Sequence, residues 1–303
     1  MTSPIAWMNG KLIPFAQAGL PLWDLGVVAG ASISEMARTF AHRPFQLPRH
    51  LNRLLDSLRK VGFPTPFNRE QLLQATEAVL AHNLGLISAH RELGIVVFST
   101  AGANATYLGT QAALASQPTT VVHTFELPFE IWRPQLREGV RLRIPSVRQI
   151  PDGCFDVALK VRNRLHWWLA DQEAGKLEPG SKALLLDHAG FLTETSTAAL
   201  HLVCDGRILM PDRSVLNSLS SQLVEELASS IGIATERRPV PPDEIQLASE
   251  AFLSSSAAGL LPVSHIQGEP IGQTLPGPVF GQLAKAWSEL VGVDIVRQIL
   301  QEE

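Results

Sequence analysis

Hydrophobic residues recur along the chain at two spacings, one typical of helices and one typical of strands. Leucines at 51, 54, 55 and 58 are three or four residues apart, which places them on one face of a helix that Gly62 ends. Amphipathic or largely apolar stretches of similar length recur further along the chain. Helices are therefore predicted over residues 49–62, 70–83, 156–174, 216–232 and 278–290.

Strands are predicted where apolar residues alternate with polar ones or run continuously between turn residues. The pair Asn9-Gly10 separates two short apolar runs, which is the strongest local signal for a hairpin. Residues 181–210 have the pattern of three strands, with tight turns at 188–190 and 205–206. Further strands are predicted over residues 93–100, 119–124, 140–145 and 250–256.

The stretch 156–174 carries a single lysine among largely apolar residues, and Lys160 fits two interpretations. Its stem can pack along the predicted helix while the ammonium group reaches water, which is the commonest arrangement. Alternatively, Lys160 lies in a pocket that excludes water, where the neutral amine can form a Schiff base with a carbonyl group. The helix pattern alone favours the first interpretation.

The length of 303 residues suits two domains of ordinary size. Residues 125–135 contain two prolines and show little periodicity, which is typical of a junction between domains. We therefore expect a small N-terminal domain over 1–124, an interdomain linker over 125–135, and a large domain over 136–303.

The composition favours small-molecule chemistry. A net charge of -4 with 18% charged residues provides no basic field for nucleic acid. Two cysteines, Cys154 and Cys204, cannot form a disulfide framework or a cysteine metal cluster. The N-terminus lacks a secretory signal pattern, and no apolar run approaches the ~20 residues that span a bilayer. A soluble, cytoplasmic protein without a metal, a nucleic-acid partner or a membrane partner is expected.

Three groups of polar residues are candidates for chemistry. Glu194 begins a run of small and hydroxyl residues between apolar strands, where an acid needs a cationic or protonated partner. Residues 216–221 start a helix with hydroxyl and amide side chains, which is ordinary capping chemistry and also suits a bound phosphate. His50 and Arg53 lie on one side of their predicted helix, where a solvated arginine is the ordinary alternative.

The order of these pieces resembles the class IV aminotransferases, the fold-type IV pyridoxal-phosphate enzymes. This group includes branched-chain and D-amino acid aminotransferases and aminodeoxychorismate lyase. The shared pattern is an Asn-Gly hairpin, an Asp-x-Gly turn, a His-x-x-Arg-Leu helix, the lysine, Gly-x-x-Thr-Glu, a hydroxyl-rich helix start, and Phe-Leu-x-x-Ser-Ala-Ala-Gly-x-x-Pro-Val. It covers nearly the whole chain. The resemblance implies an α+β fold with a small N-terminal α/β sandwich, a larger lobe with a β-barrel-like core, and the cofactor at their interface.

The resemblance also implies a role for each candidate residue. Lys160 is expected to hold pyridoxal 5'-phosphate as a Schiff base (an aldimine) and to move the proton between the substrate Cα and the cofactor. Glu194 is expected to accept from the pyridinium N–H, which keeps the ring an electron sink. The expected phosphate-binding residues are Arg53, Leu219, Ser220 and Ser256, and the expected substrate-binding residues are Arg38, Arg164 and Ala257.

Five positions depart from the family pattern, and they concern substrate recognition. Ala29 and Ser34 stand where the aminotransferases usually have a tyrosine and a phenylalanine, so the pocket is expected to be wider and less apolar. The family asparagine is missing at Ala199, and arginines found in several members are missing at Thr100 and Ser221. A substrate carboxylate is therefore expected to bind Arg38, Arg164 or backbone donors, unless the substrate is not a standard amino acid.

Two reactions and one non-catalytic role stay open. The favoured reaction transfers an amino group between an amino acid or amine and a 2-oxo acid. The alternative is aminodeoxychorismate lyase, which forms 4-aminobenzoate and pyruvate and whose Lys-x-x-Asn-Arg-Leu motif is present at 160–165. A non-catalytic binding protein on the same fold is expected to lose Lys160 or Glu194, and both are present. Family members are typically homodimers, so a homodimer is expected by analogy.

Overall fold

The computed structural model describes residues 3–109 and 118–301, and the chain divides into two compact units. Unit 1 contains Met1–Leu127 and Leu159–Asn163, and unit 2 contains Pro128–Ala158 and Arg164–Glu303. The short segment with Lys160 therefore belongs to unit 1, although the chain on both sides of it belongs to unit 2.

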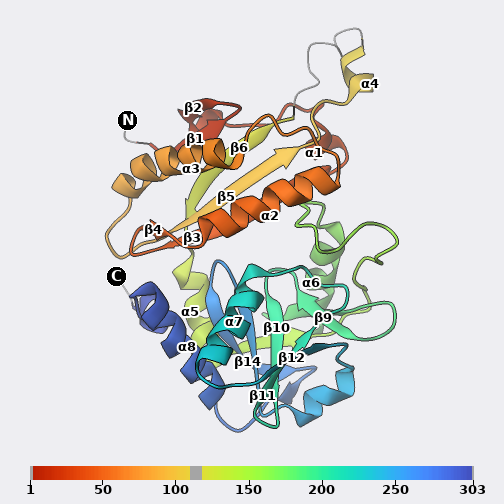
Figure 1. The fold of residues 1–303 in the computed structure, drawn as a ribbon. Helices are drawn as coiled ribbons and strands as arrows, with labels where there is room; N and C mark the ends of the chain where they lie inside the picture. The colour runs from red at the N-terminus through yellow and green to blue at the C-terminus, as the bar shows by residue number, and fades with distance from the viewer. Residues whose placement is uncertain (1–2, 110–117, 302–303) are drawn as a thin grey trace. The chain divides into compact units, whose positions relative to one another are not determined.

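Unit 1 is an antiparallel six-stranded sheet in the order β2-β1-β6-β5-β3-β4, with two helices packed on one of its faces (Figure 1). Leucines of these two helices form a core with the strands beneath them. The strands are β1 (Ile5–Met8), β2 (Lys11–Pro14), β3 (Ser32–Phe40), β4 (Arg43–Pro44), β5 (Leu93–Thr100) and β6 (Thr120–Glu126). The helices are α1 (Leu25–Val28), α2 (Leu47–Lys60), α3 (Arg69–Asn83) and α4 (Ala105–Leu108).

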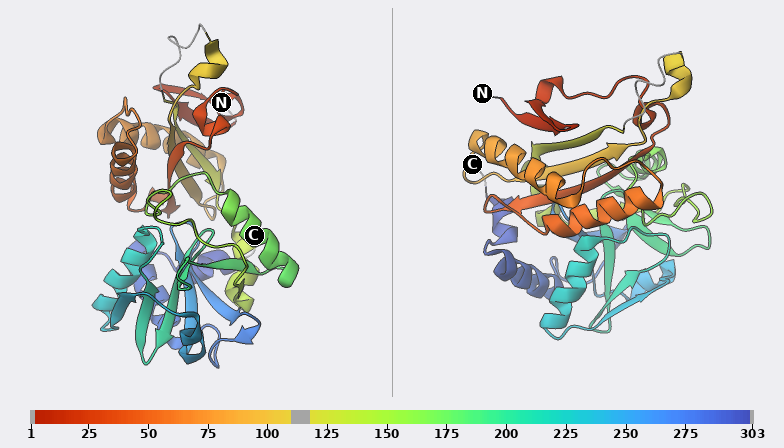
Figure 2. Two further views of the ribbon diagram at one scale, coloured as in Figure 1. Left: turned by 90° about the vertical axis from the view of Figure 1, so that its right-hand side faces the viewer. Right: turned by 45° about the horizontal axis from the view of Figure 1, so that its top comes forward.

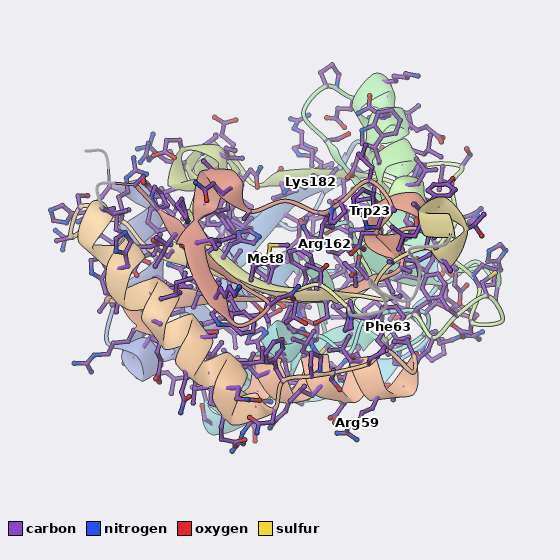
Figure 3. The ribbon with its side chains drawn as sticks, turned by 90° about the horizontal axis from the view of Figure 1, so that it is seen from above. Met8, Trp23, Arg59, Phe63, Arg162 and Lys182 are labelled. Carbon is purple, nitrogen blue, oxygen red and sulfur yellow. The ribbon has the colours of Figure 1, made fainter. Side chains whose placement is uncertain are left out.

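The local sequence explains most elements of unit 1. Asn9 and Gly10 both adopt positive φ, 48° and 91°, which a type I′ hairpin turn between β1 and β2 requires. Asn68 and Gln71 form a reciprocal capping box at the start of α3. At the C-terminal end of α2 the side chain of Arg59 projects outward (Figure 3). The buried residues of α2 are four leucines together with His50 and Ser57.

Alternation along β3 decides which of its side chains face α2. Ile33 and Ala37 lie in the core with Leu51 and Leu54 of α2. Glu35 has the same parity as these two residues, so its carboxylate is directed toward α2 as well. A buried acid on this face requires partners from the helix.

Unit 2 contains a closed barrel of six strands in the order β7-β8-β9-β10-β13-β14, with β14 paired to β7. Figure 2 shows the strands of this unit in yellow-green to blue. The pair Glu194 and Ala199 closes it between β9 and β10. The strands are β7 (Val140–Arg143), β8 (Lys182–Leu186), β9 (Leu192–Thr195), β10 (Ala199–Cys204), β13 (Glu250–Ser255) and β14 (Gly259–Ile266), with β11 (Arg207–Pro211), β12 (Thr235–Arg238) and β15 (Glu269–Pro270) outside the barrel. The helices are α5 (Phe129–Glu138), α6 (Leu165–Leu177), α7 (Leu219–Ser230), α8 (Pro278–Val291) and α9 (Ile295–Leu300).

The predicted helix over 156–174 is wrong in its first half, because α6 begins only at Leu165. Lys160 lies in an irregular segment whose backbone pairs with β3. The Ser34 N–H donates to the Lys160 carbonyl at 2.9 Å, and Ile33 and Val161 form an antiparallel bridge. Because β4 covers only the far end of β3, this edge offers free backbone groups, and pairing with them outweighs the local helical pattern.

Residues 125–135, predicted as a linker, contain the boundary between the two units, at Leu127 and Pro128, and most of helix α5, which tolerates Pro134. One further prediction needs correction. The stretch 181–210 forms four strands rather than three, because residues 196–198 turn the chain between β9 and β10. The hydroxyl-rich sequence here favours such a turn, since Thr195 Oγ1 bonds the backbone of Ala198.

No helix among residues 3–109 and 118–301 is both long and apolar enough to cross a membrane.

Candidate active site

Lys160 is fixed through its backbone to β3 in unit 1. Besides the bond from Ser34 N–H, the Arg162 N–H donates to the Ser32 carbonyl at 3.2 Å, so the segment is held on both sides of the bridge. Leu159 is buried in the core next to it. The Lys160 side chain is half-buried, and its positive charge acts on His50 of α2. A backbone held this firmly leaves the side chain as the moving part.

Glu35, His50 and Arg53 form a buried cluster on the α2 side of β3. Arg53 donates to Glu35 through two nitrogens, Nε to Oε1 at 2.6 Å and Nη2 to Oε2 at 2.8 Å. His50 Nδ1 lies 2.8 Å from Glu35 Oε2. Such a fork-to-fork pair fixes the plane of the guanidinium group. Arg53, predicted to bind phosphate, is therefore oriented by an acid that sequence reasoning had not paired with it.

Burial alone raises the pKa of Glu35, but hydrogen bonds from His50 and Arg53 outweigh burial and lower the pKa to about 2. Burial lowers the pKa of His50, and the charges of Arg53 and Lys160 add to that effect while Glu35 opposes it. The cluster thus holds one carboxylate between two basic side chains, and the charge of Lys160 acts on one of them, His50.

Arg38, a predicted substrate-binding residue, is only 2% exposed in β3. Its Nε donates to the Thr39 carbonyl at 2.9 Å, and its guanidinium carbon lies 3.9 Å from the centre of the Phe40 ring. Burial lowers the pKa of Arg38 to about 9, with the charge of Glu92 opposing this, so the group stays protonated at neutral pH. These contacts give Arg38 a structural role in unit 1, and its substrate role stays a prediction.

Thr100, where several family members have an arginine, is fully buried. Its hydroxyl donates to Asp24 Oδ2 at 3.0 Å and accepts from the backbone N–H groups of Gly102 and Thr119. Thr119 Oγ1 donates to the same Asp24 oxygen. The position therefore ties a loop to the end of β5.

Glu194 and Arg164 interact electrostatically in unit 2. Glu194 is half-buried where β9 meets β10, and its Oε1 accepts from the Leu216 N–H at 2.9 Å. Arg164 donates to the Ser196 carbonyl. Burial lowers the pKa of Arg164, and the negative charges of Glu194 and Asp171 oppose this shift. The acid thus has the cationic neighbour that its position required.

The first turn of α7 is rich in buried hydroxyl groups. Ser218 caps the helix by accepting from the Ser221 N–H, and Ser220 Oγ lies 2.8 Å from Ser218 Oγ. Leu219 and Ser220 are buried, and Ser254 of β13 donates to Ser220 Oγ at 3.2 Å. Free N–H groups and hydroxyls gathered at a helix start suit an anion.

The remaining predicted positions of unit 2 lie close to this turn in sequence or contact. Ser256 and Ala257 follow β13 in the turn to β14, with Ser256 half-buried and Ala257 buried. Ser221, where the family often has arginine, receives a hydrogen bond from Arg237 of β12 at 3.1 Å. A guanidinium group therefore reaches this position from another element.

The comparisons with known proteins agree with this architecture. Residues 32–266 match the family described as amino-transferase class IV. The branched-chain-amino-acid aminotransferase of Pseudomonas aeruginosa is 25% identical over 294 residues, which cover 95% of this chain and 92% of that protein.

Solved structures give the same result. A branched-chain amino acid aminotransferase from T.th., complexed with N-(5'-phosphopyridoxyl)-L-glutamate, superposes with a TM-score of 0.83 at 27% identity, covering 96% of this chain and 95% of that one. The same enzyme with pyridoxamine 5'-phosphate gives the same values. The chain therefore belongs to the class IV aminotransferase family, and the predicted family and α+β fold are confirmed.

Proposed function

We propose that this protein is a pyridoxal-phosphate-dependent aminotransferase that transfers an amino group between an amino acid or amine and a 2-oxo acid. The placement of Lys160 carries the proposal, because its backbone is fixed to β3 and its charge lies beside the Glu35–His50–Arg53 cluster. Similarity over nearly the full length to branched-chain aminotransferases, one of them holding pyridoxyl ligands, supports it.

The side chains present fit the functional groups of pyridoxal phosphate. In unit 1, Arg53 offers a guanidinium group that suits a phosphate. In unit 2, the first turn of α7 offers backbone N–H groups and the Ser220 hydroxyl, which also suit a phosphate. Glu194 offers a half-buried carboxylate for a pyridinium N–H. When bound, the cofactor supplies an aldehyde carbon that reacts with amines and a ring that stabilises negative charge on the substrate Cα.

The residues of this chain then have separate tasks. Lys160 Nζ accepts and returns the proton at the substrate Cα, since its four-carbon stem moves while its backbone does not. Glu194 keeps the ring nitrogen protonated, and the Leu216 N–H fixes the orientation of its carboxylate. Glu35 holds the Arg53 guanidinium group in one plane for the phosphate. Arg38 and Arg164 are the proposed carboxylate ligands.

Reduction with borohydride tests the attachment directly. Purified protein incubated with pyridoxal phosphate is expected to absorb in the visible range, and borohydride is expected to fix the cofactor on Lys160, as peptide mass spectrometry can detect. Lys160→Ala is expected to abolish labelling and turnover while keeping the fold. A Lys160→Ala protein with normal turnover contradicts the proposal.

Lys182 provides a matched control for this experiment, because it is a half-buried lysine at the start of β8. Burial lowers the pKa of Lys182 while Asp171 opposes the shift, so its amine is also partly withdrawn from water. Lys182→Ala is expected to keep both labelling and turnover. Loss of labelling in both variants would indicate general damage to the protein.

Aminodeoxychorismate lyase is the second candidate, supported by the motif Lys160-Val-Arg-Asn163-Arg164-Leu165. Asn163 packs against Gly30, whose φ is +66°, so this part of the motif has a fixed place in unit 1. An amino-donor screen that begins with branched-chain amino acids separates the two reactions. Release of pyruvate and 4-aminobenzoate from aminodeoxychorismate, without any reaction with amino acids, identifies the lyase.

A further inference from the structure

In unit 2, a series of hydrogen-bonded side chains connects His201 of β10, through Ser254 of β13, to the first turn of α7. His201 Nε2 lies 2.8 Å from Ser254 Oγ, and Ser254 Oγ donates to Ser220 Oγ at 3.2 Å. Ser220 Oγ lies 2.8 Å from Ser218 Oγ. His201 is 0% exposed, Ser254 1% and Ser220 4%. Water therefore has almost no access to these three residues.

Strand register explains why His201 reaches Ser254. His201 of β10 is opposite Phe252 of β13, and Ser254 lies two residues further along β13 on the same face of the sheet. The His201 ring stacks on the Phe252 ring, with centres 4.9 Å apart and planes at 15°. The stack fixes the ring plane, and α7 contacts β13 above it.

Counting hydrogens assigns a direction to the series. A serine hydroxyl has one hydrogen, and Ser254 gives its hydrogen to Ser220. The hydrogen between His201 and Ser254 must then come from His201 Nε2. Either serine can be the donor in the 2.8 Å bond between Ser218 Oγ and Ser220 Oγ. When Ser218 donates, Ser220 accepts from both Ser254 and Ser218 and keeps its own hydrogen for a further acceptor at the start of α7.

The ionisation of His201 agrees with this assignment. Burial lowers the pKa of His201 to about 3, and the positive charge of Arg237 adds to the shift, so the ring is neutral at physiological pH. Within residues 3–109 and 118–301, Nδ1 has no hydrogen-bond partner. The tautomer with hydrogen on Nε2 leaves only a lone pair unsatisfied at Nδ1, rather than a buried N–H donor.

We propose that His201 is a positioning residue for the cofactor phosphate, acting through Ser254 to keep the Ser220 hydroxyl as a donor toward that anion. This inference depends on the proposed function, in which Ser220 binds the phosphate. It adds a fully buried residue that no sequence motif indicates.

The test compares two ligands of the apoprotein that differ only in the phosphate, pyridoxal phosphate and pyridoxal. His201→Phe keeps a ring for the Phe252 stack and removes the donor. It is expected to weaken pyridoxal phosphate binding about 3- to 10-fold, the value of one hydrogen bond, and to leave pyridoxal binding unchanged. His201→Gln, which retains an N–H at a similar distance, is expected to restore part of the loss.

Two further variants keep the test decisive if His201→Phe folds poorly. Ser254→Ala breaks the series without changing the ring and is expected to lower the ratio of the two affinities by the same factor. Phe252→Leu disturbs the packing of His201 without removing a hydrogen bond, so it is expected to lower the thermal stability and leave the ratio unchanged. The inference is overturned if His201→Phe and Ser254→Ala each weaken the binding of pyridoxal phosphate and of pyridoxal equally. It is also overturned if neither variant weakens the binding of pyridoxal phosphate.

Ser220→Ala separates this inference from the proposed function. If Ser220→Ala leaves the affinity ratio at its wild-type value, Ser220 does not bind the phosphate and the proposed phosphate site is wrong. If Ser220→Ala lowers the ratio while Ser254→Ala and His201→Phe do not, the phosphate site stands and the positioning role of His201 is refuted.

Discussion

At the residue scale, the pairing of Glu35 with Arg53 and His50 is the central feature of unit 1. The acid is 2% exposed, and a carboxylate at this depth persists only with fixed partners. The same bidentate bond that stabilises the acid also fixes the guanidinium group of Arg53. Stability and the orientation of a proposed phosphate ligand therefore depend on one side chain.

Glu35→Gln is expected to destabilise the protein by about 3 kcal/mol, because it removes one partner of a buried ion pair and leaves Arg53 charged without it. Urea denaturation of the apoprotein measures the change. The pair Asp56–Arg59 provides the control, since it lies on α2, the helix that carries Arg53, and both of its side chains are more than half exposed. Asp56→Asn is expected to change stability by less than about 1 kcal/mol. Equal effects of the two substitutions contradict the buried role of Glu35.

The pH dependence of stability follows from the same residue. The pKa of Glu35 is lowered from 4.5 to about 2, so the folded state binds fewer protons than the unfolded chain between these values. Its contribution, about 3 kcal/mol, is complete above pH 4.5 and is lost as the pH falls toward 2. In Glu35→Gln, the free energy of unfolding is expected to depend less on pH between these two pKa values than it does in the wild type. An unchanged acid slope in the variant contradicts the assignment.

At the element scale, the segment that carries Lys160 gains its position from backbone pairing rather than from its own sequence. The bonds from Ser34 N–H and Arg162 N–H attach residues 160–162 to the free edge of β3. Strand pairing of this kind depends on backbone groups, so most side-chain changes in the segment preserve it.

Arg162→Pro is expected to lower turnover by about 10-fold or more, because it removes the N–H that donates to Ser32 and shifts Lys160 from its place. Arg162→Ala is the matched control, since it keeps the backbone donor and removes only the side chain, whose guanidinium carbon lies 4.6 Å from the centre of the Phe98 ring. Steady-state kinetics with the preferred amino donor measure both variants. Turnover that falls equally in both indicates a side-chain effect instead.

At the scale of the whole molecule, the chain leaves unit 2 at Ala158, contributes five residues to unit 1, and returns at Arg164. The candidate residues are divided accordingly, with Lys160, Arg53 and Arg38 in unit 1 and the other six in unit 2. A ligand that binds only the folded chain stabilises it by mass action.

Pyridoxal phosphate is therefore expected to raise the melting temperature of the apoprotein in a concentration-dependent manner. At a concentration of 100 times Kd, the expected stabilisation of the folded state is about 2.7 kcal/mol. Scanning calorimetry of the wild type and of Lys160→Ala, with and without cofactor, measures this. The variant is expected to show a smaller shift because only non-covalent contacts remain. No shift in the wild type contradicts cofactor binding.

The sequence predicted the elements whose signals are local. The turn at Asn9-Gly10, the leucine face of α2 and the capped start of α7 follow from nearby residues, and the structure contains all three. The order of motifs predicted the family and the two-part α+β architecture, because each motif keeps its own local chemistry. The predicted site residues are all present, and their roles stay predictions.

Only the tertiary structure decided the surroundings of Lys160. The apolar stretch 156–174 has a helical pattern, but the free edge of β3 lies more than a hundred residues away in sequence and takes the lysine segment into unit 1. The partners of Glu35 and the hydrogen bonds from His201 to Ser220 could not be predicted from the sequence for the same reason. Both sets of contacts join residues that only folding brings together. Local sequence determines what a segment can form, and long-range pairing determines which of those forms is stable.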